Sequence, residues 1–150
     1  MIRVEQSVTV NRPVEEVFAF VADQTNAPRW QSGLLEVRRM TDGPLGVGTQ
    51  HTFVRKFLGR RLEASNEYGE YEPNKTIAFK STSGPMDFRA GYRTEPIAGG
   101  TKLTSWIEMQ PKGFAGLAEP LIAASLRREL AANLGELKEL LERGVVAVSS

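Results

Sequence analysis

Few side chains in this sequence could perform chemistry. The chain contains one histidine, His51, and no cysteine. Disulfides, iron–sulfur clusters and thiolate zinc sites are therefore excluded, and one imidazole with scattered carboxylates matches no common metal site. The sequence holds neither a His-Glu-x-x-His motif nor the Gly-x-Ser-x-Gly turn of hydrolases. We therefore expect no metal, no cofactor and no Ser-His-Asp nucleophile.

General acid–base chemistry stays open, because it needs only one or two groups in a dry pocket. His51 titrates near neutral pH, although a strand histidine that faces solvent or bonds a neighbouring carbonyl is the simpler interpretation. Tyr68 and Tyr92 could polarise a ligand carbonyl, or their phenols could instead reach water at the rim of a sheet. The catalytic residues are thus unknown, and the candidates are Tyr68, Tyr92, His51 and Asn66.

The elements that must position these side chains follow from the period of the apolar residues. Apolar residues at even positions predict a strand over residues 2–10, in which Gln6 faces a cavity or a local irregularity. Asn11 is predicted to cap a helix whose apolar stripe is Val14, Val17, Phe18 and Val21, at spacings of three and four. A short helical turn is expected at residues 26–30.

From residue 34 to residue 109 the pattern is that of strands separated by turns. Turn signals such as those at residues 42–44 and 98–100 recur about every 10–15 residues, which favours an antiparallel meander. Simple alternation places Phe88 and Tyr92 on the inward face and Arg89 toward solvent.

The last segment changes to a helical period. A helix is predicted from about Ala118 to Glu142, with Pro120 in its first turn and Gly144 as its stop. Its apolar stripe must be buried against the face of the sheet, the only large apolar surface available. The predicted stripe is Leu117, Leu121, Ala124, Leu130, Leu134, Leu137 and Leu141. Residues 144–150 are expected to form a short tail.

Composition limits the partners. The formal net charge is +1, which argues against a nucleic-acid-binding surface. No stretch approaches the roughly 20 apolar residues of a membrane-spanning helix, and the first residues lack the apolar centre of a signal peptide. We expect a cytoplasmic protein with one domain over residues 1–150, and a homodimer stays open.

Several short motifs occur in a characteristic order. They are NRPVEEVFAFVAD at residues 11–23, Trp30, GVGT at 46–49, YEPN at 71–74 and GGTKLT at 99–104. In these motifs the chain resembles the START-like (SRPBCC) superfamily, specifically its polyketide cyclase/dehydrase-like branch, over roughly residues 2–143. The resemblance implies an α+β helix-grip fold. In this fold a curved antiparallel sheet of about seven strands wraps around a long C-terminal helix, and two short helices follow the first strand.

A strongly curved sheet around a helix leaves a gap, which side chains fill or a ligand occupies. We predict that the ligand contacts residues from both layers: Trp30, Phe53, Asn66, Tyr68, Phe79, Ser81, Phe88, Tyr92, Ser105, Ile107, Leu117, Leu121, Ala124 and Ser125. Small residues at the helix positions would leave room for it, or would allow close helix–sheet packing.

Three hypotheses for function follow. The first is the binding of a small hydrophobic or amphipathic metabolite in a cavity between sheet and helix, without chemistry. The second, which rests mainly on the resemblance, is a cyclase/dehydratase-like enzyme that uses the tyrosines, Asn66 or His51 as acid–base or orienting groups. The third is a protein-interaction domain that uses the outer face of the sheet around an exposed Trp106.

Overall fold

The structure is a computed structural model that describes residues 1–57, 59–84, 86–111 and 119–144. Within these residues, one seven-stranded antiparallel sheet is accompanied by two α-helices and a 3-10 helix, η1. The elements are β1 (Ile2–Val10), α1 (Val14–Ala22), η1 (Gln24–Arg29), β2 (Leu34–Arg39), β3 (Gln50–Phe57), β4 (Arg60–Glu72), β5 (Thr76–Ser83), β6 (Met86–Ile97), β7 (Gly100–Pro111) and α2 (Glu119–Glu142).

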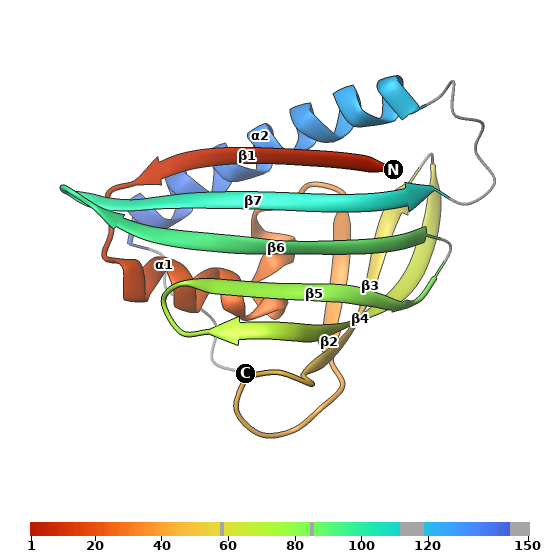
Figure 1. Cartoon of the computed structure of the whole chain (residues 1–150), viewed down its shortest axis with the longest axis horizontal. Coiled ribbons are helices and arrows are strands. Elements are labelled where there is room, and N and C mark those ends of the chain that lie inside the picture. Colours follow the sequence, from red (N-terminus) through yellow and green to blue (C-terminus); the bar gives the residue numbers. More distant parts are fainter. Residues whose placement is uncertain (58, 85, 112–118, 145–150) are drawn as a thin grey trace.

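The sheet is a meander whose first strand closes onto its last. The strand order is β1-β7-β6-β5-β4-β3-β2, so consecutive strands are neighbours from β2 to β7 and β1 joins β7. The sheet curls so that β2 and β3 turn away from β1, and α2 runs behind β1 (Figure 1). These features confirm the predicted α+β helix-grip fold.

Helix α1 begins differently from the prediction. Pro13 occupies the cap position without a side-chain hydrogen bond, and its fixed backbone angle suits the start of a helix. Asn11 is therefore not the cap. Its backbone N–H instead donates to the Glu142 carboxylate over 2.9 Å, which ties the end of β1 to the end of α2.

Helix α2 confirms the predicted stripe in its second half and corrects it in the first. Leu134, Leu137 and Leu141 are buried, whereas Leu121 is 75% exposed. Leu121 lies nine residues before Leu130, about two and a half helical turns, and so points to the opposite side. The inward face of the first half is Ile122, Ala123, Leu126 and Leu130.

The buried apolar residues form two clusters. The larger one surrounds α1 and the second half of α2, and includes Phe20, Tyr68 and Leu137. The smaller one contains Ile2, Val4 and Met109, against which the first half of α2 packs. The space between sheet and helix is not filled where the two clusters meet, and the candidate site lies there.

The outer face of the sheet carries charged side chains that pair with each other. Trp106 lies on this face but is only 8% exposed, because the guanidinium groups of Arg3 and Arg89 stack over its ring at 5.7 and 5.5 Å. Glu108 pairs with both arginines. Arg89 faces outward, as predicted. The third hypothesis needs an exposed Trp106 indole, but the two arginines cover this ring.

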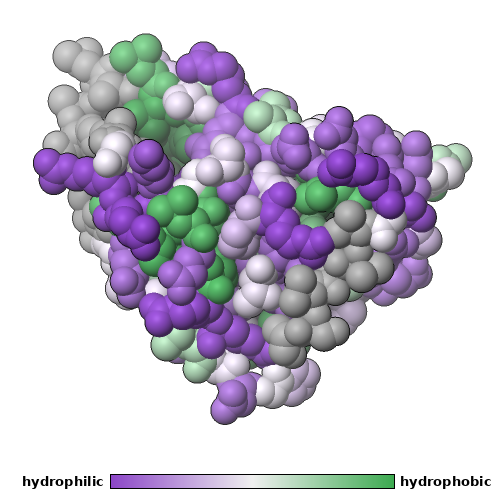
Figure 2. Space-filling model, turned by 180° about the vertical axis from the view of Figure 1, so that it is seen from behind, coloured by the Kyte–Doolittle hydropathy of each residue, from purple (hydrophilic) through white to green (hydrophobic). Residues whose placement is uncertain are grey.

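The face seen from behind is mostly hydrophilic, and its hydrophobic side chains form separate groups (Figure 2). Large apolar side chains that are exposed, such as Leu121 and Val47, belong to different elements. Single exposed apolar residues are usual on protein surfaces and do not indicate a docking site.

Candidate ligand-binding site

A cavity of about 180 Å³ lies between the concave face of the sheet and the middle of α2. Its walls come from η1 and the residues after it, from strands β2 to β7, and from α2. The sheet exposes this face because alternate residues of each strand share a side. A space of this size is large enough for about one aromatic ring with a small substituent, since an apolar cavity of about 150 Å³ holds benzene.

Aromatic side chains form much of the wall. Phe53 and Phe88 meet edge to face with ring centroids 6.1 Å apart, and Phe79 contacts Tyr92 at 6.3 Å. Trp30 also packs edge to face against Tyr92, at 5.9 Å. Such a wall favours a ligand with flat apolar surface.

Two polar groups of the wall keep unused hydrogen-bond donors. The indole nitrogen of Trp30 is buried and has no hydrogen-bond partner among the residues that the structure describes. The Tyr92 hydroxyl accepts a bond from Gln31 Nε2 over 3.2 Å, and no described residue accepts its own proton. Burial raises the pKa of Tyr92, so the phenol stays neutral and able to donate. The site therefore suits a ligand acceptor such as a carbonyl oxygen.

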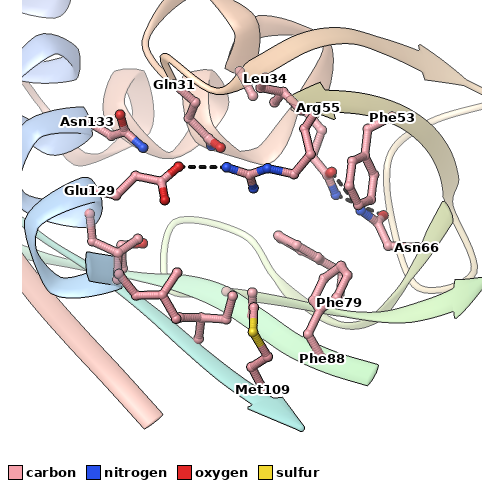
Figure 3. A pocket seen from close by; sticks show the side chains of 18 of the residues that line it. Gln31, Leu34, Phe53, Arg55, Asn66, Phe79, Phe88, Met109, Glu129 and Asn133 are labelled. Atoms are coloured by element: carbon pink, nitrogen blue, oxygen red, sulfur yellow. Dashed lines mark hydrogen bonds and ion pairs between the residues drawn. The ribbon is translucent and has the colours of Figure 1, made fainter. Parts of the chain in front are cut away.

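Asn66 also lines the cavity, but its amide is already committed. Its Nδ2 donates to Gln24 Oε1 over 2.9 Å, and Gln24 Nε2 donates back to Asn66 Oδ1 over 3.1 Å. This reciprocal pair, drawn with dashed lines in Figure 3, leaves Asn66 little capacity for a reacting group without breaking a buried bond.

A salt bridge lies where the cavity meets solvent. Arg55 of β3 and Glu129 of α2 point toward each other across the cavity (Figure 3), with 2.6 Å between Nη2 and Oε1. Their side chains are 31% and 30% exposed and also line the cavity. Gly33 adjoins the pair, because a Cβ on it would lie 3.0 Å from Arg55 Nη2.

Two of the four catalytic candidates do not line the cavity. The Tyr68 hydroxyl donates to the Ala22 carbonyl over 2.6 Å, and burial raises its pKa. His51 is fully buried and stacks on Tyr68 with 5.3 Å between ring centroids. Burial lowers the pKa of His51 to about 4, so the imidazole is neutral at pH 7 and lacks access to the cavity.

The predicted contact residues separate into three groups. Eight of them line the cavity: Trp30, Phe53, Asn66, Phe79, Phe88, Tyr92, Ser105 and Ile107. Five lie outside its wall: Tyr68, Ser81, Leu121, Ala124 and Ser125. The Ser81 hydroxyl instead accepts a bond from the Phe88 backbone, and the three helix residues precede the part of α2 that faces the cavity. Leu117 and tail residues 145–150 lie outside the described residues.

The prediction missed the other sixteen wall residues, among them Gln31, Leu34, Arg55, Leu126, Glu129 and Asn133. Arg55 was within reach of the sequence, because it lies two residues after the inward Phe53 on the same strand. Glu129 and Asn133 follow Leu126 at helical spacing, but only the observed placement of α2 shows that this side meets the cavity.

A family model described as polyketide cyclase / dehydrase and lipid transport matches residues 1–142. The chain belongs to this family. An uncharacterized protein of Mycobacterium tuberculosis is 31% identical over 124 residues, which cover 77% of this chain and 72% of the relative. The family assignment confirms the resemblance found in the sequence.

Solved structures of similar shape agree with this polyketide cyclase/dehydrase and lipid transport fold. The ZhuI aromatase/cyclase from a Streptomyces species has a TM-score of 0.79 at 17% identity, covering 97% of this chain and 96% of its own. A Thermus thermophilus protein has a TM-score of 0.81 at 17% identity, covering 95% and 99%. At these identities the likeness establishes the fold alone.

Among its described residues, this family member has neither a cluster of metal-binding side chains nor a membrane-spanning helix. No group of three or more histidine, cysteine or acidic side chains among them is placed to hold a metal ion. None of the helices in the described ranges has the length and apolarity to cross a membrane.

Proposed function

We propose that this protein binds one small, largely apolar molecule that carries a hydrogen-bond acceptor, and that it releases this molecule unchanged. The observation that carries the proposal is the buried, unpartnered indole N–H of Trp30 in the wall of an apolar cavity. Leaving a buried donor unpaired costs about 1–3 kcal/mol. Less than 1 Å² of the Trp30 indole nitrogen is exposed, so a ligand acceptor recovers this cost only when the ring turns its N–H toward the cavity. The aromatic wall supplies the apolar contact.

A cyclase/dehydratase activity, the second hypothesis, has less support. Tyr68 and His51 are bonded or buried away from the cavity, and Asn66 is held by Gln24. The Tyr92 phenol lines the cavity but, with its raised pKa, is a donor rather than a base. These positions favour orientation of a ligand over proton abstraction.

The test uses two probes of similar size, acetophenone and cumene (isopropylbenzene). Acetophenone has a carbonyl oxygen where cumene has a methyl group. Nitrogen-15 NMR reports on the two indole N–H groups separately. We expect both probes to shift signals of cavity residues, and only acetophenone to move the Trp30 indole signal downfield. Trp106 also borders the cavity, but its ring is stacked under Arg3 and Arg89 on the outer face of the sheet, so its indole signal serves as the comparison and should not move downfield with acetophenone.

The variant Trp30→Phe keeps an aromatic ring and removes the donor. We expect it to weaken acetophenone binding about fivefold, the equivalent of one net hydrogen bond of about 1 kcal/mol, and to leave cumene binding nearly unchanged. If neither probe saturably perturbs cavity residues of the wild type, the proposal is wrong.

A further inference from the structure

The charges on the cavity wall are limited to one pair. Among the wall residues that the structure describes, only Arg55 and Glu129 carry a formal charge. They come from different layers, β3 and α2, and are 74 residues apart in the chain. The formal charges of the wall therefore sum to zero, and the two charged groups are paired with each other.

The pair is built into its surroundings. The bond between Arg55 Nη2 and Glu129 Oε1 is 2.6 Å long, as expected for charge-assisted hydrogen bonds. Gly33 leaves space for it, since an added Cβ would lie 3.0 Å from Arg55 Nη2 and 3.5 Å from Glu129 Oε1. The backbone holds this glycine against β3 through a bond of 2.8 Å from Lys56 N to Gly33 O.

Arg55 by itself would make this cavity a carboxylate site. A guanidinium at the edge of an apolar, aromatic pocket is the usual partner of an organic anion. Its Nε is buried without a hydrogen-bond partner among the described residues, so Arg55 has donor capacity that Glu129 does not use. A ligand carboxylate at that position, however, would lie within a few ångströms of the Glu129 carboxylate and be repelled.

We propose that Glu129 makes the cavity selective for neutral ligands, because it occupies Arg55 and repels carboxylates. Glu129 is thus a specificity-determining residue, and the ligand class is uncharged aromatic molecules with a carbonyl-type acceptor. This inference rests on the proposed function, since selectivity requires that the cavity bind a ligand.

The test compares acetophenone with benzoate, which have nearly the same shape but differ in charge. Binding is measured by calorimetry and by the Trp30 indole signal for wild type, Glu129→Gln and the double variant Arg55→Gln/Glu129→Gln. Wild type should bind acetophenone and exclude benzoate. Glu129→Gln should gain about tenfold or more in benzoate affinity, because it removes the repulsion and frees the guanidinium.

The double variant is the matched control, because it lacks both charges and should bind acetophenone without gaining benzoate. Failure of the proposed function and failure of the role of Glu129 give different results. A wild type that binds neither acetophenone nor cumene overturns the proposed function and this inference with it. A wild type that binds acetophenone, together with a Glu129→Gln protein that gains no benzoate affinity, overturns the role of Glu129 alone. An equal benzoate gain in the double variant also overturns it, since Arg55 would not be the receptor.

Discussion

The buried polar side chains of this protein differ in whether the protein itself supplies their hydrogen-bond partners. Tyr68, Asn66 and Gln24 have short bonds to described groups and hold the wall of the cavity in place. Trp30 and His51 are buried with ring nitrogens that have no partner among the described residues. Of these two, only Trp30 lines the cavity, so its donor is available to the proposed ligand, whereas the effect of His51 is on stability.

His51 should make the protein less stable in mild acid. Burial lowers its pKa to about 4 in the folded state, against about 6.5 when unfolded. Between these values the unfolded chain binds more protons, so the stabilisation is complete above pH 6.5 and decreases as the pH falls toward 4. From pH 7.5 to pH 5 we expect a loss of about 2 kcal/mol, measured by urea unfolding.

The control for this measurement is His51→Gln, which has a neutral side chain at every pH. Carboxylates contribute to both proteins, so the difference between the two pH profiles isolates the imidazole. Parallel profiles for the two proteins would show that His51 does not keep a lowered pKa.

At the scale of elements, α2 has two different roles along its length. Its second half packs Leu134, Leu137 and Leu141 into the larger core cluster. Its first half carries Leu126, Glu129 and Leu130 along the cavity. One helix therefore anchors the fold and lines the site, and its exposed side includes Leu121.

The two sides of α2 should respond differently to the same substitution. Leu137→Ala removes a fully buried side chain and should lower the free energy of unfolding by about 2–5 kcal/mol. Leu121→Ala changes an exposed leucine of the same helix and should alter it by less than about 0.5 kcal/mol. Chemical denaturation checks both. Equal losses would show that the helix is rotated from the position described.

At the scale of the molecule, the cavity results from how the two layers curve. The sheet is tightly packed at Gly91, where an added Cβ would lie 2.3 Å from the Ile77 carbonyl oxygen and 3.0 Å from the Trp106 ring. Tight backbone packing there and aromatic side chains in the wall keep the space between the core clusters open. Several elements border this open space, and none of them depends on a side chain inside it. A larger side chain that fills the cavity should therefore change the ligand affinity more than the free energy of unfolding.

Ala90→Phe tests this expectation. Ala90 lines the cavity opposite Phe79 on β5, and a phenyl ring there would occupy the ligand's place. We expect acetophenone binding to be lost while the free energy of unfolding stays within about 1 kcal/mol of wild type. Ala22→Phe is the control at a filled site, where overpacking should cost about 1–3 kcal/mol. A similar loss for Ala90→Phe would indicate that no open cavity exists in solution.

The fold and much of the aromatic wall could be predicted from the amino-acid sequence alone. Period-two patterns predicted that Phe79 and Phe88 face inward, since a strand's alternation is set by its own backbone and needs no partner. The same pattern left the inward face of the strand around His51 and Phe53 open. The 3.6-residue period likewise predicted α2 and its buried Leu134 and Leu137.

The part of α2 that borders the cavity, and the polar groups that come together there, depend on how the sheet and the helix pack against each other. A local period gives directions within one element, but the broad apolar arc of α2 allowed several rotations, and the prediction wrongly placed Leu121 inside. The meeting of Arg55 with Glu129, and the covering of Trp106 by two arginines, depend on sheet curvature and on packing between segments far apart in the chain. Distances of this kind are set by the whole core, so no short stretch of sequence contains them.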